Sequence, residues 1–470
     1  MITTVLAVHA VAAIAAVAHL LLHYRRPSAA VAWLFALTLL PLLGPLAYAM
    51  LAVPGGGPTL RRQRRAAEVR SPRSRAAADI GDGPSAEYPT PAFAALMRRV
   101  RAFPVTRGNA VDVLPDADVA LREQLAAIRG SEQEVLLATY VLKPGVVQRQ
   151  LFEALADRAG AGVPVRLLID PIGSHELEAR ALENLRSRGV HTHTFLSPNP
   201  LRGRLQINFR NHRKILCVDG RLAFTGGRNW SDEYYPGTGS DGVFRDTTVR
   251  LRGPVVADIR RVFAEDWSLA TEDDALLDAP LRPESAAGDH SVCVQPFGPD
   301  EPRSSVADVF GGAFRAARRS IFVATPYFVP GPTLQNALRV AALGGVDVEL
   351  LLPNRCGKRS IDLTARFYLD SLLDAGVRAR LCDPPLLHAK ALIVDGCWSS
   401  VGSVNFDARS LHLNYELNVE VLGEEFARQL RAFFAADMER ARLLDAEAFA
   451  RRGRWRRTIE KAAALFEPLM

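Results

Sequence analysis

The chain contains the stretch His212-Arg-Lys214-Ile-Leu-Cys-Val-Asp219-Gly220 and, further along, the stretch His388-Ala-Lys390-Ala-Leu-Ile-Val-Asp395-Gly396. In both, the lysine stands two positions after the histidine, the aspartate seven and the glycine eight. The agreement extends to a later glycine and asparagine at equal distances from each histidine: Gly226 with Asn229, and Gly402 with Asn405. Chance or shared local structure does not fix so many polar positions, so the repeat indicates two copies of one functional unit.

The spacing within each copy predicts a local structure. The four residues after each lysine, 215–218 and 391–394, are apolar and predict a buried strand. A histidine and a lysine two positions apart on an extended chain point to the same side. The Asp-Gly pair that follows is typical of a hairpin turn, which would bring the asparagine back beside them. Each copy is therefore expected to present an imidazole, an ammonium and an amide on one surface, and two facing surfaces would enclose one phosphate.

The sequence around each motif repeats as well. In the first half we predict strands at residues 134–140 and 163–169 with a helix at 148–161, and a further helix at 176–188. The second half has the same order, with strands at 320–327 and 346–352 and helices at 333–343 and 361–375. Strands that alternate with helices predict an α/β fold with a largely parallel or mixed sheet. We expect two such domains, at residues 89–270 and 288–470, separated by an acidic and proline-containing stretch.

The N-terminal 53 residues are predicted to anchor the chain in a membrane. Residues 5–22 are apolar apart from two histidines. Residues 29–53 carry no charged side chain, and this segment is long enough to span a bilayer. A cleaved signal peptide is the alternative for the first segment and a buried core helix for the second. Because Pro41 and its neighbours interrupt the second segment, a full span and a re-entrant segment both remain open.

Residues 54–88 are predicted to be a basic linker along the membrane surface. They are rich in glycine, proline and serine, and they contain seven arginines: Arg61, Arg62, Arg64, Arg65, Arg70, Arg73 and Arg75. A solvated charged tail is the alternative, but attraction to anionic headgroups is favoured beside an apolar segment. The positive-inside rule then places the rest of the chain in the cytoplasm.

Composition restricts the partners. The formal net charge of +7 over 470 residues fits an anionic partner, and anionic lipid and nucleic acid fit equally well. The five cysteines form no C-x-x-C pair, so neither a zinc site nor a disulfide framework is indicated. Cys356-Gly-Lys-Arg359 resembles a phosphate loop only superficially, because the earlier glycine and the final serine or threonine are missing.

The repeated residues suit phosphoryl chemistry. Imidazole acts as a nucleophile or as a general acid, so one of His212 and His388 could attack phosphorus while the other protonates the leaving oxygen. Lys214 and Lys390 would supply positive charge to the non-bridging oxygens, and Asn229 and Asn405 would donate amide hydrogens to them. The lysines would repel a cation, so no metal is expected.

Carboxylates have two predicted roles. Asp246 follows His212 and Glu416 follows His388 at similar distances along the sequence. Each of these carboxylates is therefore expected to orient the imidazole of its own half. Asp219 and Asp395 complete the repeated motif and join the candidate catalytic residues. For this last pair a structural role, in the turn and a polar network, is the favoured alternative.

Paired motifs of this kind resemble those of the phospholipase D superfamily, and further segments are similar to bacterial cardiolipin synthases. These segments include Asn211-His-Arg-Lys-Ile-Leu, Asp232-Glu-Tyr, Phe244-Arg-Asp-Thr, Thr325-Pro-Tyr-Phe-Val-Pro, and Val401-Gly-Ser-Val-Asn-Phe-Asp-Ala-Arg-Ser-Leu with Asn414-Tyr-Glu416. The similarity covers nearly the whole chain, from the apolar N-terminus to Leu465-Phe-Glu-Pro-Leu469. Residues 236–241 depart from the family pattern.

The resemblance implies two phospholipase-D-like α/β/α sandwich domains behind a membrane-anchoring helical hairpin, with the active site between the domains. It also implies a phosphohistidine intermediate, with His212 as nucleophile and His388 as general acid and later base. The implied reaction is phosphatidyl transfer between two phosphatidylglycerol molecules, giving cardiolipin and glycerol, with no metal or nucleotide cofactor.

The expected partners are phosphatidylglycerol, other anionic phospholipids and the bacterial inner membrane, with the catalytic domains on the cytoplasmic side. No nucleic acid partner is expected. Three alternatives remain: a phospholipase D that hydrolyses lipids to phosphatidic acid, a nuclease of the superfamily, and a non-catalytic lipid-binding protein. The anchor argues against the nuclease, and the two intact motifs argue against the non-catalytic protein.

Overall fold

The computed structural model describes residues 2–23, 27–51, 88–197, 209–238, 243–280, 284–299 and 305–467. The chain divides into two units: an N-terminal one that covers residues 1–64 with 196–209, and a larger one that covers residues 65–195 and 210–470. Most of the predicted basic linker, together with Arg25 and Arg26, lies outside the described residues.

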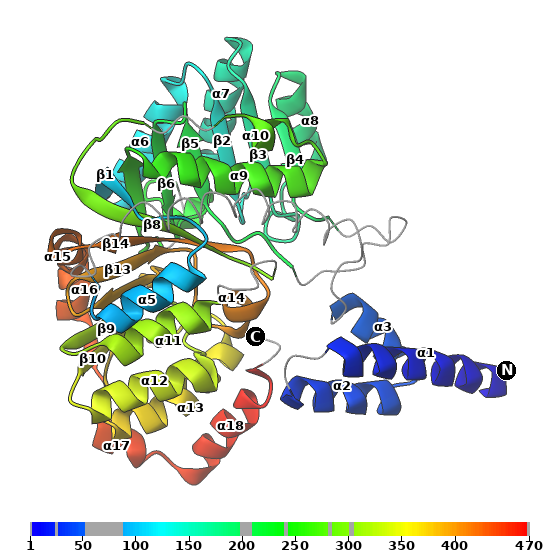
Figure 1. Ribbon diagram of the computed structural model, residues 1–470. Helices are drawn as coiled ribbons and strands as arrows, with labels where there is room; N and C mark the ends of the chain where they lie inside the picture. The colour runs from blue at the N-terminus through cyan, green and yellow to red at the C-terminus, as the bar shows by residue number, and fades with distance from the viewer. Residues whose placement is uncertain are drawn as a thin grey trace. The chain divides into compact units, whose positions relative to one another are not determined.

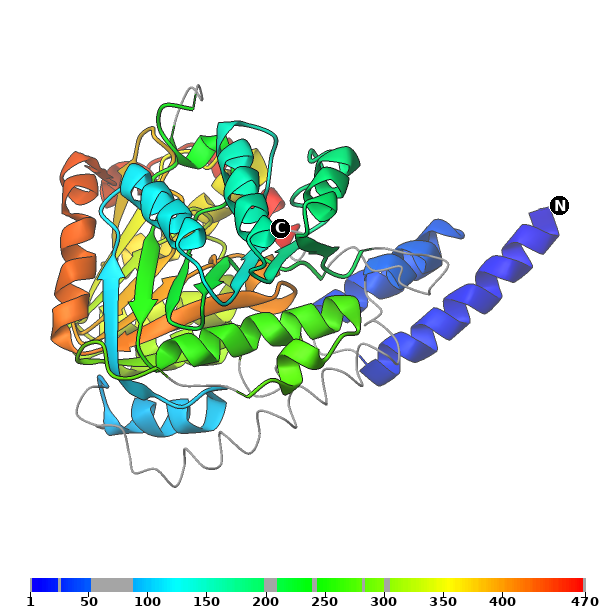
Figure 2. The same ribbon diagram turned by 90° about the horizontal axis from the view of Figure 1, so that it is seen from above.

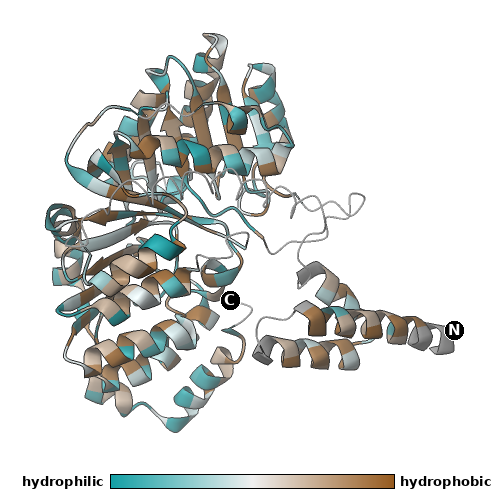
Figure 3. Cartoon of the chain, in the orientation of Figure 1, coloured by the Kyte–Doolittle hydropathy of each residue, from teal (hydrophilic) through white to brown (hydrophobic). Residues whose placement is uncertain are grey.

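The described residues of the N-terminal unit include the helices α1 (Ile2–His23), α2 (Pro27–Leu39) and α3 (Leu43–Leu51), which are mostly apolar (Figure 3). The predicted second segment is therefore two helices instead of one. Proline has no N–H to donate, and Leu42 after Pro41 has a positive φ of 60°, which ends the helical path there. Across the unit, His19 Nδ1 lies 3.0 Å from the Tyr48 hydroxyl. Among the helices of the described residues, none is both long enough and apolar enough to cross a membrane.

The larger unit is built from two halves with the same order of elements (Figure 1). The strands of the first half are β1 (Thr106–Val113), β2 (Val135–Thr139), β3 (Val165–Ile169), β4 (His191–Thr194), β5 (Ile215–Val218), β6 (Leu222–Gly226) and β7 (Thr248–Arg252). Its helices are α6 (Ala117–Arg129), α7 (Val146–Gly160), α8 (Ala179–Ser187), α9 (Val255–Thr271) and the short η3 (Asp232–Tyr234) and α10 (Ala275–Asp278).

The second half repeats this arrangement and adds a C-terminal segment. Its strands are β8 (His290–Phe297), β9 (Ser320–Ala324), β10 (Asp347–Pro353), β11 (Arg378–Cys382), β12 (Ala391–Val394), β13 (Trp398–Gly402), β14 (Glu416–Leu422) and β15 (Arg442–Leu443). Its helices are α11 (Val306–Ala316), α12 (Gly331–Leu343), α13 (Arg359–Asp374), α14 (Ala408–His412), α15 (Glu424–Phe433), α16 (Ala435–Arg440), α17 (Ala446–Ala450) and α18 (Arg454–Ala464).

One mixed sheet runs through both halves. Its order is β15-β11-β10-β9-β12-β13-β14-β8-β1-β7-β6-β5-β2-β3-β4, so the halves join where β8 pairs with β1 in the antiparallel sense. Strands β2, β3 and β4 are parallel, as are β9, β10 and β11, and the motif strands β5 and β12 are antiparallel to their neighbours. The predicted α/β fold with an internal repeat is confirmed.

Helices cover both faces of the sheet. In the first half, α6, α7 and α8 lie on one face and α9 on the other (Figure 2). All five residues of β2, Val-Leu-Leu-Ala-Thr, are buried, which explains why this strand is a continuous apolar run and not an alternating one. The predicted helices and strands of each half agree with the structure apart from their ends, which differ by a few residues.

Helix α5 (Pro91–Val100) differs from the predicted domain boundary. The prediction assigned it to the first domain, yet its buried residues Phe93, Ala94 and Met97 pack in the core of the second half. The rings of Phe93 and Trp398 of β13 meet edge to face, with centroids 5.3 Å apart. The chain therefore packs against the second half before it enters the first half at β1.

We expect Phe93→Ala to lower the free energy of unfolding by about 3 kcal/mol, because it removes a buried aromatic side chain from this core. Chemical denaturation of the full chain, followed by tryptophan fluorescence, measures the change. Phe93→Leu is the matched control and should cost about 1.5 kcal/mol or less. Equal stability of wild type and Phe93→Ala would show that α5 does not belong to this core.

Candidate active site

Each motif folds as the predicted hairpin. All four residues of β5 and all four of β12 are buried, and each strand is followed by an antiparallel partner, β6 or β13. Both residues of each Asp-Gly pair have positive φ, 54° and 66° at Asp219 and Gly220, and 53° and 66° at Asp395 and Gly396. Glycine and aspartate tolerate this conformation, which explains the pair at the turn.

The two motif aspartates lie at the other end of the strand from the histidines. The Asp219 carboxylate accepts the backbone N–H groups of residues 132, 133 and 134 at 2.7–3.1 Å, just before β2. The Asp395 carboxylate does the same for residues 318, 319 and 320, just before β9. The structure thus supports the alternative for both residues: they are tied to backbone amides that hold the hairpin, and their inclusion among the catalytic candidates is corrected.

The histidine–carboxylate pairs cross between the halves. His212 Nδ1 lies 2.8 Å from Glu416 Oε2, and His388 Nδ1 lies 2.7 Å from Asp246 Oδ2. All four side chains are buried. Counting along the sequence had assigned each carboxylate to the histidine of its own half, and this assignment is wrong. Both carboxylates do orient an imidazole, but that of the other half.

Backbone pairing across the halves explains the exchange. Residue 211 forms a parallel bridge with residue 415, and residue 245 forms one with residue 387. The His212 N–H donates to the Tyr415 carbonyl at 2.9 Å, and the His388 N–H donates to the Arg245 carbonyl at 2.7 Å. Each histidine is therefore placed beside the residue that precedes a carboxylate of the opposite half.

The two lysines lie close to the histidines, as predicted, and both are buried. Lys214 Nζ donates to the His212 carbonyl at 2.8 Å and lies 5.3 Å from the ring centre of Tyr140. Lys390 Nζ lies 2.7 Å from His388 Nδ1 and 3.7 Å from Asp246 Oδ2. The two ammonium groups therefore differ: one contacts an aromatic ring and the other a histidine–aspartate pair.

Burial sets the protonation states of the site. Desolvation, opposed by Glu416 and reinforced by the charge of Lys214, lowers the pKa of His212 to about 4. Desolvation and the adjacent Lys390 lower the pKa of His388 to about 3, so both imidazoles are neutral at pH 7. Burial likewise lowers the pKa of Lys214 to about 7 and that of Lys390 to about 8.

The two carboxylates remain ionised. Burial alone would raise their pKa values, but nearby positive charge and hydrogen bonds outweigh it and lower both. For Asp246 the lowering comes mainly from the charge of Lys390 and the hydrogen bond from His388, and for Glu416 it comes from the hydrogen bond from His212 and the charge of Lys214. Each carboxylate can thus hold its histidine with the proton on Nδ1.

The predicted asparagines differ from one another. Asn229 Nδ2 donates to the Tyr234 hydroxyl at 2.9 Å, and its Oδ1 accepts the Val141 N–H at 3.2 Å. Asn229 is thus engaged within the protein. The carbonyl oxygen of Asn405 is buried and has no partner among the described residues. The predicted phosphate contact stays a prediction for both.

Several residues around the pairs were not predicted to have a role. Ser403, Ser410 and Asn414 donate to the Glu416 carboxylate, Ser410 at 2.7 Å and Asn414 at 3.2 Å. The Tyr234 hydroxyl lies 3.4 Å from His388 Nδ1. Ser403 and Asn414 stand inside the family-like segments, which is the signal that could have identified them. Tyr234 has no repeated partner in the other motif, but it closes the family-like segment Asp232-Glu-Tyr234 and so carried the same signal.

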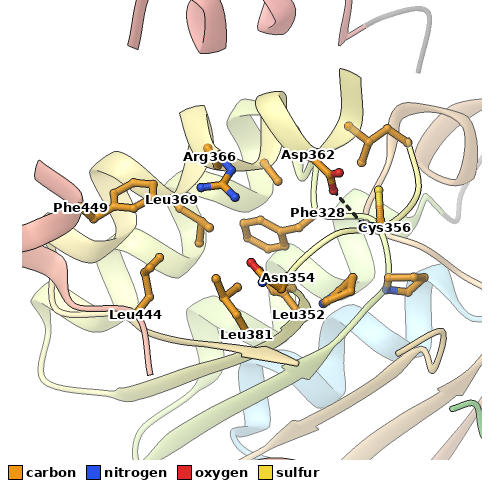
Figure 4. Close-up of a pocket in the computed structure, with 14 residues that line it drawn as sticks. Phe328, Leu352, Asn354, Cys356, Asp362, Arg366, Leu369, Leu381, Leu444 and Phe449 are labelled. Atoms are coloured by element: carbon orange, nitrogen blue, oxygen red, sulfur yellow. Dashed lines mark hydrogen bonds between the residues drawn. The ribbon is translucent and has the colours of Figure 1, made fainter. Parts of the chain in front are cut away.

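No group of three or more histidine, cysteine, aspartate or glutamate side chains suited to a metal is present in the part of the chain that the structure describes. A small hollow lies instead in the second half, where β9 and β10 end against α13, and contains none of the predicted site residues (Figure 4). Arg366 reaches from α13 towards Phe328 across an otherwise mostly apolar lining. This hollow is thus distinct from the paired histidines.

Comparison with known proteins defines the family. The model of the family described as "Cardiolipin synthase, PLD-like domain" matches residues 125–267 and 312–438, which together include both motifs. The chain belongs to the cardiolipin synthase family. A model described as "Phospholipase D-nuclease N-terminal" matches residues 11–52, which lie within the predicted N-terminal anchor. The recognition made from the motifs is confirmed.

Individual members of the cardiolipin synthase family are similar to this chain over almost its whole length. The chain is 32% identical to the cardiolipin synthase of Geobacillus kaustophilus over 96% of this chain and 90% of that protein. It is also 32% identical to cardiolipin synthase A of Pseudomonas putida (strain W619), over 98% and 97% of the two chains. Among solved structures, phosphatidylserine synthase of Haemophilus influenzae superposes with a TM-score of 0.61 at 12% identity, over 80% of this chain and all of that one. That likeness shows a shared fold.

The crossed pairs predict which carboxylate supports which histidine. An activated-phenol phosphodiester should label the protein by forming a covalent adduct on one histidine. We expect that this labelling is stopped by substitution of the carboxylate in the opposite half, and not by substitution of the one in the same half. For label on His212, Glu416→Gln should reduce adduct formation by about 10³-fold or more, while Asp246→Asn should leave the adduct intact. Peptide mapping of the labelled histidine measures this. Loss of label with the carboxylate of the same half would contradict the crossed arrangement.

His212→Ala and His388→Ala serve as controls in this experiment. With His212 as nucleophile, His212→Ala forms no adduct with any substrate, and His388→Ala still forms one because a phenolate needs no proton to leave. The reverse result would exchange the two roles and leave the test of the crossed pairs unaffected.

Proposed function

We propose that this protein is a phosphatidyltransferase that joins two phosphatidylglycerol molecules into cardiolipin and releases glycerol. The observation that carries the proposal is the pair of buried, neutral imidazoles, each oriented by a carboxylate of the opposite half. The charge of each lysine also lowers the pKa of the histidine in the other half, so the two motifs act within one electrostatic site. Membership of the cardiolipin synthase family and relatives of that name over nearly the full chain support the same activity.

In the first step, His212 is the nucleophile. Its Nδ1–H donates to Glu416, which leaves the Nε2 lone pair to attack phosphorus. The bond to the glycerol oxygen breaks, and His388 donates a proton to that oxygen. The products are a phosphatidyl group on His212 and free glycerol. Lys214 and Lys390 stabilise the negative charge on the non-bridging oxygens.

In the second step, His388 is neutral and acts as the base. It accepts the proton of a glycerol hydroxyl on the second phosphatidylglycerol while that oxygen attacks phosphorus. The bond from phosphorus to His212 Nε2 breaks, and cardiolipin is released. One phosphodiester replaces another, so the reaction needs no separate energy source.

The substrate can supply the protonation state that the first step requires. His388 is neutral in the free site because burial and Lys390 both oppose its positive charge. A bound phosphodiester brings negative charge next to the imidazole, which raises its pKa. A larger fraction of His388 therefore carries the proton that the leaving oxygen needs once the lipid headgroup is bound.

We further propose that the N-terminal apolar helices attach the enzyme to the bacterial inner membrane, with the α/β unit on the cytoplasmic side. The apolar character of α1–α3, the match of residues 11–52 to an N-terminal family model and the seven arginines after the helices support this placement. The lipid substrate would then be taken from the leaflet that faces the active site.

Purified protein with labelled phosphatidylglycerol should form cardiolipin and glycerol in equal amounts, and turnover should persist in excess chelator. Thin-layer or mass-spectrometric analysis of the lipids and an enzymatic assay of glycerol measure both products. Phosphatidic acid as the main product would instead identify a hydrolase of the phospholipase D type. Loss of turnover on chelation, restored by a divalent ion, would contradict the metal-free mechanism.

The KM for phosphatidylglycerol should rise about tenfold between pH 7 and pH 9. The pKa values of Lys214 and Lys390 in the free site are about 7 and 8, so both ammonium groups lose their charge as the pH rises through this window. Initial rates at a fixed surface density of lipid give KM and kcat separately. Lys390→Arg keeps its charge throughout and should flatten the upper part of the rise. A KM independent of pH would show that these charges do not bind the phosphate.

A further inference from the structure

Helix α18 and the turn after it present large apolar side chains to solvent. Trp455 is 76% exposed, Leu465 is 80% exposed and Phe466 is 59% exposed. Within α18, Trp455, Ile459 and Ala462 stand four and three positions apart and fall on the same face, and Leu465 and Phe466 follow in the turn after the helix. These residues form a continuous apolar stripe, which we call the α18 face: Trp455, Ile459, Ala462, Leu465 and Phe466.

The side of α18 that faces α13 carries charged residues, which reverses the usual polarity of a surface helix. Glu460 is only 1% exposed and accepts Arg452 Nε at 2.9 Å. Arg452 and Arg457 donate to Asp370 of α13 at 2.8 and 3.2 Å. The helix lies along α13 at the outside of the second half (Figure 1). Ion pairs with α13 thus hold α18 in place and leave its apolar stripe directed outward.

Positive charge surrounds the stripe. Residues 451–466 contain six basic residues and one acidic residue, and that acid is the buried Glu460. Arg454, Arg456 and Lys461 are exposed at the sides of the helix. Tryptophan and phenylalanine favour the boundary between headgroups and acyl chains, and lysine and arginine beside them favour anionic lipid.

We propose that the α18 face rests on the surface of a membrane that contains anionic phospholipid, with Trp455 and Phe466 inserted at the level of the headgroups. The charge complementarity favours lipid over another protein surface, since the border of the stripe is basic on both sides. The contact would orient the α/β unit on the leaflet from which the proposed function draws its substrate. Only this orienting role rests on the proposed function; the contact with lipid itself does not.

Fluorescence of the full-length protein in phosphatidylglycerol nanodiscs tests the contact without any turnover. Trp455 is the most exposed of the five tryptophans, and the difference between wild type and Trp455→Phe isolates its emission. We expect this emission to shift to shorter wavelength and to be quenched by lipids brominated near the glycerol end of the acyl chain. With phosphatidylcholine alone, and with Arg454→Glu/Lys461→Glu on anionic lipid, the quenching should fall several-fold.

Two results would overturn the proposal. Trp455 that stays open to aqueous iodide and insensitive to brominated lipid would show that the face is in water. Trp455 shielded from both quenchers would show that another part of the chain or a second copy covers the face.

Activity gives a second readout. Trp455→Ser/Phe466→Ser should raise the apparent KM for phosphatidylglycerol in vesicles about tenfold and leave turnover of monomeric, short-chain phosphatidylglycerol unchanged. Val340→Ser on α12, which removes an apolar side chain that is 54% exposed and lies outside the α18 face, is the matched control and should change neither value. Unchanged KM in vesicles would contradict the proposal. Absence of turnover in wild type would count against the proposed function only, because the quenching experiment does not depend on it.

Discussion

The active site depends on two short backbone contacts that cross between the halves of the larger unit. The segment that carries each histidine pairs with the segment that carries a carboxylate of the other half, at residues 211 with 415 and 387 with 245. Each imidazole therefore receives its orientation from a group that lies in the other copy of the repeat. Neither half has a complete histidine–carboxylate pair of its own, so pairing of β1 with β8 and closure of these bridges are conditions for chemistry as well as for folding.

The symmetry of the repeat is broken at the carboxylates, which gives the two histidines different surroundings. Glu416 is held by Ser403, Ser410 and Asn414 as well as by His212. At the position equivalent to Ser403 the first half has Gly227, and a β-carbon there would lie 2.1 Å from Asp246 Oδ1. The shorter carboxylate thus occupies the space of the missing side chain, and Lys390 and Tyr234 lie beside its histidine. A rigidly held imidazole suits a nucleophile, and one next to a second ionisable group suits proton transfer.

The sequence predicted the parts that depend on local pattern. Apolar runs at residues 215–218 and 391–394 fixed the motif strands, and Asp-Gly fixed the turns, because both rest on neighbours along the chain. The partner of each histidine and the place of α5 could not be predicted in the same way. Both depend on which segments meet across more than a hundred residues, and sequence distance gives no information about that. The break at Pro41 was visible as an interruption, but its consequence for the backbone at Leu42 came only from the structure.

The charge balance of the site supports the proposed binding of a phosphodiester. Two lysines and two carboxylates are removed from water together with two neutral imidazoles, and burial weakens the hold of both lysines on their protons. An uncompensated cation in such surroundings is costly, and pairing with an opposite charge offsets part of that cost. A phosphodiester brings the negative charge that stabilises the ammonium form of Lys214 and Lys390 and the protonated form of His388. In the proposed mechanism, binding and activation are therefore coupled: the group that is to be transferred also creates the charge state that transfers it, and a headgroup without a phosphodiester would do neither.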